Sequence, residues 1–173
     1  APCAMKNIPS FYSHKIAYGP AVKRALKSEG DRILLDLPLK DVIEFVAKAL
    51  DKRVCDVVVV TLDRPRHADI IKQVRATGAA LRMITDGDIY VGMGGSPEAV
   101  LTAAALKCLG GDMDVRMWFH DEAHRAEVAD QVSAEELTRV FRCDDLVPGE
   151  SALFCATGIS DSPLLPGVRT IGH

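Results

Sequence analysis

Patterns that would place this chain in several large classes of protein are missing from its 173 residues. The net charge of −3 gives no basic field, which argues against nucleic acid as a partner. The longest apolar runs are too short to cross a bilayer, and the amino-terminal residues have no charged-then-apolar signal pattern, so we expect no membrane partner. Neither Gly-x-Gly-x-x-Gly nor Gly-Lys-Ser/Thr occurs, which excludes a Rossmann or P-loop interpretation.

The cysteines are few, scattered and odd in number, and they form no Cys-x-x-Cys pair. Several of them lie inside apolar runs. We therefore expect buried, reduced thiols rather than disulfides or a zinc site. A reducing compartment follows, with the cytoplasm as the default and a plastid as the alternative. The five are Cys3, Cys55, Cys108, Cys143 and Cys155.

The composition is that of one globular domain, residues 1–173, with 48% hydrophobic and 26% charged residues and no repeat or linker. Apolar runs predict strands over residues 11–18, 54–62, 81–84, 89–91, 115–119 and 151–156. Helical spacing and capping signals predict helices over residues 39–50, 68–77, 97–109 and 133–141. Strands that alternate with helices predict an α/β fold with a largely parallel or mixed sheet.

A glycine-rich segment after the strand at residues 89–91 predicts a turn that ends at Gly95. Ser96 is expected to cap the following helix, and Pro97 suits its first position. The free N–H groups and the positive dipole end of such a helix attract phosphate. Glu98 adds a carboxylate at the same place, so a divalent cation could lie between this carboxylate and a bound phosphate. The alternative is structural: an acid in a first turn suits the dipole, and the glycines only let the chain turn.

Three polar clusters follow successive predicted strands: Arg64-Pro65-Arg66, Asp86-Gly87-Asp88 and the segment from Gly92 to Glu98. Ligands of α/β sheets gather beyond the carboxyl ends of the strands, so these clusters are expected to meet. The arginines suit phosphate, and the aspartates suit sugar hydroxyls or a metal ion. Each cluster also has an ordinary interpretation, because the arginines could form surface ion pairs and the aspartates could form only a turn. His67 is expected at a loop or helix start rather than as a ligand.

Taken together and in order, several motifs resemble the class II fructose-1,6-bisphosphatases, including the bifunctional fructose/sedoheptulose bisphosphatases. The segments that carry the resemblance are Pro9-Ser-Phe-Tyr12 with Lys15-Ile-Ala-Tyr-Gly-Pro20, Asp63-Arg-Pro-Arg-His67, Ile84-Thr-Asp-Gly-Asp88, Gly92-Met-Gly-Gly-Ser-Pro-Glu98, Cys108-Leu-Gly-Gly111 and Ala156-Thr-Gly-Ile159. The resemblance implies a layered α/β sandwich of the inositol monophosphatase-like sugar phosphatase superfamily. It also implies hydrolysis of the 1-phosphate of fructose 1,6-bisphosphate with Mg²⁺ or Mn²⁺.

Carried over residue by residue, the resemblance implies roles for nine positions and leaves the catalytic residues unassigned. It implies substrate contacts at Tyr12, Arg64, Pro65, Arg66, Asp86, Gly87, Asp88 and Gly95, and a metal ligand at Glu98. The metal ion would polarise the phosphoryl group and activate water, while the arginines would hold the phosphate remote from the chemistry.

The resemblance covers the carboxyl half of the family, without the amino-terminal half that carries most of the metal carboxylates. The connection between Asp88 and Tyr90 is also shortened, and so is the end of the chain after Arg169. Three hypotheses follow. The chain is the substrate-binding half of a sugar bisphosphatase that works as a homo-oligomer or with a companion chain or half. Alternatively, it is a non-catalytic paralogue with a structural or interaction role, or a phosphate-binding module for an unrelated substrate.

Overall fold

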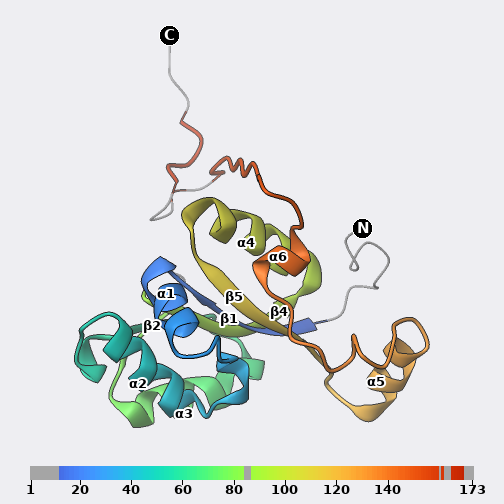
Figure 1. The fold of residues 1–173 in the computed structure, drawn as a ribbon, viewed down its shortest axis with the longest axis horizontal. Helices are drawn as coiled ribbons and strands as arrows, with labels where there is room; N and C mark the ends of the chain where they lie inside the picture. The colour runs from blue at the N-terminus through green and yellow to red at the C-terminus, as the bar shows by residue number, and fades with distance from the viewer. Residues whose placement is uncertain (1–11, 84–86, 160, 162–164, 170–173) are drawn as a thin grey trace.

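A five-stranded mixed sheet forms the centre of the chain in the computed structural model, which describes residues 12–83, 87–159, 161 and 165–169 (Figure 1). The strands are β1 (Tyr12–Tyr18), β2 (Val58–Thr61), β3 (Ala80–Met83), β4 (Ile89–Gly95) and β5 (Asp112–Trp118). Their order across the sheet is β3-β2-β4-β1-β5. Strands β3 and β4 run parallel to β2, whereas β1 lies antiparallel between β4 and β5. The expected α/β architecture with a mixed sheet is confirmed.

Helices cover both faces of this sheet, as Figure 1 shows. One face carries α1 (Pro20–Ser28), α2 (Leu39–Ala49) and α3 (Ala68–Thr77). The opposite face carries α4 (Ser96–Leu109) and α6 (Cys143–Leu146), while α5 (Glu122–Ala129) follows β5. Three single turns of 3₁₀ helix complete the fold: η2 (Leu34–Asp36), η3 (Val54–Asp56) and η4 (Pro65–His67).

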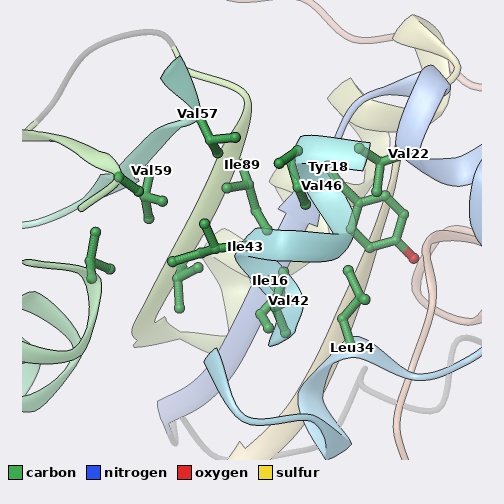
Figure 2. Packing of buried hydrophobic residues seen from close by; sticks show 14 of the residues in the cluster. Ile16, Tyr18, Val22, Leu34, Val42, Ile43, Val46, Val57, Val59 and Ile89 are labelled. Carbon is green, nitrogen blue, oxygen red and sulfur yellow. The ribbon is translucent and has the colours of Figure 1, made fainter. Parts of the chain in front are cut away.

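Strand β1 divides its side chains between the two faces because successive residues of a strand point to opposite sides. Ile16 and Tyr18 are buried in the larger core with α1 and α2, where Figure 2 shows them beside Val42 and Val22. Ala17 packs in the second core against α4. The same alternation places Lys15 on the α4 side of the sheet. The sequence of β1 thus decides which residues can reach a site beside α4.

A buried ion pair joins β1, β5 and the segment before α6. Asp114 of β5 is fully buried, and its carboxylate lies 3.0 Å from Nε of Arg142. It also accepts hydrogen bonds from the hydroxyl of Tyr18, at 3.3 Å, and from the backbone N–H of Leu34, at 2.5 Å. Burial raises the pKa of Asp114, and the neighbouring Arg142 opposes that rise. This network ties three distant parts of the chain to β5, the edge strand of the sheet.

Several sequence-based boundaries are corrected by local hydrogen bonding. Strand β2 begins at Val58 rather than at residue 54, because residues 54–56 form η3, stabilised by an ion pair between Arg53 and Asp56 at 2.7 Å. Ser133 and Glu136 exchange the hydrogen bonds of a capping box, but residues 134–138 form turns, and residues 133–141 contain no helix. Phe141 instead pairs with Val115 at the outer edge of β5, because burial of its ring outweighs helix propensity.

Two further expectations are wrong, and one helix was not predicted. Residues 151–156 form no strand, and the nearest strand edge in sequence, that of β5, is taken by Phe141. Helix α1 was not expected, although Val22 and Leu26 have the spacing of a buried helical face. Of the four cysteines in the described ranges, all free thiols, only Cys143 is buried. Within those same ranges, no helix combines the length and apolar character needed to span a membrane.

Candidate functional site

A cavity of about 690 Å³ opens at the carboxyl ends of β2 and β4, on the α4 side of the sheet. This is where α/β sheets bind ligands. Its walls hold three cationic side chains and one carboxylate, so they favour an anion. The lining residues are Lys15, Ala17, Leu62, Arg64, Arg66, Tyr90, Gly94, Gly95, Pro97, Glu98 and Thr102.

The basic wall of the cavity is the loop between β2 and α3, which a buried histidine fixes to β4. His67 is fully buried at the start of α3. With the proton on Nδ1, its ring donates to the carbonyl of Leu62, at 2.8 Å, and accepts at Nε2 from the N–H of Met93, also at 2.8 Å. Nε of Arg66 donates to the Met93 carbonyl at 3.0 Å. The Arg66 guanidinium is therefore held in place before any ligand binds, and His67 is at the helix start, as expected.

The opposite wall is the glycine segment, which continues β4 instead of forming the expected turn. Pairing with β1 extends through the whole segment, with Gly92 opposite Lys15 and Gly95 opposite Tyr12. A Cβ at Gly92 would lie 2.6 Å from the hydroxyl of Tyr90, so a larger residue would displace that ring. The glycines thus leave space for side chains that line the cavity.

Helix α4 begins one residue earlier than expected. Gly95 occupies the cap position, and Ser96 and Pro97 are the first two helical residues, so Ser96 is not the cap. Because Gly94, Gly95, Pro97 and Glu98 all line the cavity, the amino end of this helix, with its positive dipole, is part of the wall. The helix start and the basic loop lie on the same cavity, as the sequence predicts for the arginines and Glu98.

Glu98 is the acidic residue of the cavity wall and the predicted metal ligand. A carboxylate oxygen is a donor that Mg²⁺ or Mn²⁺ accepts, so the chemistry of this side chain fits a ligand role. Over the described ranges, however, no three His, Cys, Asp or Glu side chains are grouped closely enough to hold an ion. The described residues therefore offer one donor and not a complete site.

The described part of the aspartate cluster, Gly87 and Asp88, does not line the cavity with the arginines, contrary to the expectation that the clusters meet. Asp88 forms an ion pair with Lys52 at 2.6 Å and accepts from the N–H of Val58 at 2.9 Å, at the amino end of β2. The reason is the short connection: Asp88 directly precedes β4, whose first residue, Ile89, pairs with Val59. Gly87 lies against Val58 and Val60 of β2. Substrate roles for Gly87 and Asp88 stay predictions that this placement does not support.

Three further residues are predicted to contact the substrate: Pro65, Tyr12 and Asp86. Pro65 is exposed between the two arginines, as the first residue of η4. The backbone of Tyr12 lies at the start of β1, beside Gly95. Asp86 lies outside the described residues. Their predicted contacts with substrate stay predictions.

Sequence reasoning missed five residues of the cavity lining, of which two are titratable, Lys15 and Tyr90; the other three are Ala17, Leu62 and Thr102. Lys15 is buried, and its ammonium donates to the carbonyl of Gly95 at 3.4 Å. Burial lowers the pKa of Lys15, while the charge of Glu98 opposes that change. Burial also raises the pKa of Tyr90, and nearby Arg66 opposes it. The available signal was the alternation of residues 12–18, which places Lys15 on the face opposite Ile16.

Comparison with known proteins identifies the family to which the chain belongs. The family described as bacterial fructose-1,6-bisphosphatase, glpX-encoded, matches residues 2–173. A protein of Synechococcus sp. (strain JA-3-3Ab), named D-fructose 1,6-bisphosphatase class 2/sedoheptulose 1,7-bisphosphatase, is 35% identical over 192 aligned residues, which cover 96% of this chain and 53% of the relative.

A protein of the same name from Gloeobacter violaceus (strain ATCC 29082 / PCC 7421) is 33% identical, over 93% of this chain and 52% of the relative. The chain thus spans about half the length of the curated relatives it matches. Because the family match extends over nearly the whole chain, this protein belongs to the glpX-type, class II fructose-1,6-bisphosphatase family.

Proposed function

We propose that the cavity binds the sugar bisphosphate of a class II fructose-1,6-bisphosphatase, and that this chain supplies the substrate-binding part of the enzyme. The observation that carries the proposal is the meeting of Arg64 and Arg66 with the amino end of α4 on one cavity. Guanidinium groups and helix amino ends both bind phosphate. The relatives named above are fructose-1,6-/sedoheptulose-1,7-bisphosphatases, so either sugar bisphosphate is a candidate. The superfamily fold implied by the resemblance belongs to the same proposal.

The geometry supports a different role for each of the two walls, with one phosphate of the substrate bound at each. Arg66 is held by its hydrogen bond to Met93 and, with Arg64, provides a basic wall suited to the phosphate that stays on the sugar. The wall beside Glu98 combines a helix amino end with a carboxylate, which suits the phosphate to be hydrolysed. Binding at two walls fixes the sugar between them and so orients the phosphate ester.

Glu98 would hold one side of a Mg²⁺ or Mn²⁺ ion, with the other ligands from outside the described residues. Such an ion, when bound, polarises a phosphoryl group and activates water. Further carboxylates would come from a second half of the enzyme or from another copy of the chain. The alternative function is a non-catalytic subunit, which would have no need of a cavity that binds substrate.

Calorimetric titration of this chain with fructose 1,6-bisphosphate tests the proposal. We expect saturable binding that weakens as salt is raised, because charged groups supply the affinity. Fructose, which has no phosphate, should give no heat of binding and serves as the matched control. If the bisphosphate binds no better than fructose at the same concentration, the proposed function is wrong.

A further inference from the structure

Lys15 is a charged residue of the cavity for which neither the family resemblance nor the sequence pattern gives a role. It lies in the middle of β1, with 4% of its surface exposed. β4 separates it from β2, so it stands two strands away from the loop that carries the arginines. Two strand spacings are about 10 Å. Lys15 and Arg64 therefore reach the cavity from strands on either side of β4, while Arg66 contacts β4 itself through its hydrogen bond to the Met93 carbonyl.

Burial disfavours the charged form of a lysine in this position, and the pKa of its ammonium group is lowered for that reason. Its hydrogen bond to the carbonyl of Gly95, at 3.4 Å, is a long one. A methionine would fill similar space at no desolvation cost. Groups kept at such a cost are commonly found where a ligand needs them.

The surroundings of Lys15 indicate what it contacts. A Cβ at Gly94 would lie 3.4 Å from Nζ of Lys15, so the ammonium packs beside the Gly94 backbone, and both residues line the cavity. Gly95, which accepts its hydrogen bond, is also the cap residue of α4. Glu98 and Arg66 are the charged residues whose fields act on it. The ammonium therefore lies beside the start of α4, where the charges of Glu98 and Arg66 both act on it.

We propose that Lys15 binds the 1-phosphate of the sugar bisphosphate, together with the amino end of α4, and so determines which end of the substrate faces Glu98. The inference rests on the proposed function, because it assigns one end of the same ligand. The arginines then bind the 6-phosphate. The orientation of the sugar follows from two different cationic sites, an arginine pair on the loop between β2 and α3 and a buried ammonium on β1.

Three ligands and one substitution test this assignment: fructose 1,6-bisphosphate, fructose 1-phosphate and fructose 6-phosphate, titrated into the chain before and after Lys15→Met. We expect the Kd of the bisphosphate and of the 1-phosphate to rise at least about tenfold, and that of the 6-phosphate to change less than about twofold. Lys27→Met, at an exposed lysine of α1, is the control and should leave all three unchanged. Equal weakening of all three ligands, or of none, would overturn the assignment.

Thermal unfolding distinguishes a binding role from a structural one. The pKa of Lys15 is lowered in the folded chain, so the unfolded state binds more protons as pH approaches the ordinary lysine value of 10.5, and stability from this residue rises with pH in that range. Lys15→Met should remove this rise without lowering the midpoint of unfolding at neutral pH. A midpoint lowered by many degrees would show that the lysine supports the fold, and would contradict the inference.

A measurement on the unaltered chain keeps the inference testable if the variant does not fold. The pKa of the Lys15 ammonium, followed by NMR, should rise when fructose 1-phosphate binds and stay unchanged with fructose 6-phosphate, because only a bound anion beside it favours its charged form. The opposite pattern would refute the assignment. If the bisphosphate itself does not bind, the proposed function fails first, which separates the two failures.

Discussion

Removing both guanidinium groups of the basic wall, by Arg64→Ala combined with Arg66→Ala, is expected to raise the Kd for fructose 1,6-bisphosphate by at least about 100-fold. A hydrogen bond to a charged group contributes about 1.5–3 kcal/mol, and each 1.4 kcal/mol is a tenfold change in Kd. The effect of Arg66 should exceed that of Arg64, because its hydrogen bond to Met93 orients it in advance. Calorimetric titration of the single and double variants measures both effects.

Arg75 of α3 provides the control for this experiment. It is exposed near the end of α3 and does not line the cavity, so Arg75→Ala removes one cation from the chain and should leave the Kd unchanged. Arg66→Lys is a second comparison, since it keeps a positive charge but loses the planar donor that reaches Met93. Equal weakening by Arg75→Ala and Arg64→Ala would mean that overall charge, not the cavity, attracts the ligand.

The largest effect on stability is expected at Asp114. Replacing it with alanine leaves the N–H of Leu34 without its buried acceptor and removes the buried partner of Arg142, which keeps its ion pair with Asp31 at 3.0 Å. Breaking a buried ion pair costs about 3–5 kcal/mol, and we expect the lower part of that range here. This cost measures the groups left unpaired, not a net attraction, since burial already raises the pKa of Asp114. Denaturant unfolding of the variant gives the change in the free energy of unfolding.

Two further variants test why Asp114→Ala lowers the free energy of unfolding. Asp114→Asn should cost less than alanine, because the amide oxygen still accepts a hydrogen bond where the carboxylate did. Asp36→Ala breaks an ion pair of the same type, with Arg116 at 2.6 Å, but at the surface, where such pairs contribute up to about 1 kcal/mol. Similar losses for Asp36→Ala and Asp114→Ala would contradict the distinction between the two pairs.

Local sequence signals predicted those parts of the fold that local interactions decide. Helix α3 spans residues 68–77 as expected, and Gly78 ends it with a φ of 79°, a left-handed conformation that glycine adopts without strain. The helix over residues 39–50 ends at Ala49, one residue short of the prediction. Strand β1 was expected as well, and its described residues begin at Tyr12. In each case periodicity, capping and burial favour the same structure.

The features that could not be predicted depend on pairing between segments that are distant in the sequence. Nothing within residues 12–18 shows that this strand inserts between β4 and β5, and that insertion is what places Lys15 in the cavity. The glycines of β4 carry turn signals, but pairing with β1 keeps them extended. Asp88 was expected beyond a strand end, yet it lies at the amino end of β2, because five residues connect β3 to β4. The arginines and Glu98 were predicted together, and they line one cavity.

The central claim is that Arg64, Arg66, Lys15 and the start of α4 form one binding site for a sugar bisphosphate. The most direct measurement is the change in backbone amide NMR signals of this chain during titration with fructose 1,6-bisphosphate. We predict the largest changes in the loop at residues 62–67, in residues 92–98 and around Lys15, with little change in α2. Changes concentrated elsewhere, or none at saturating ligand, would contradict the claim.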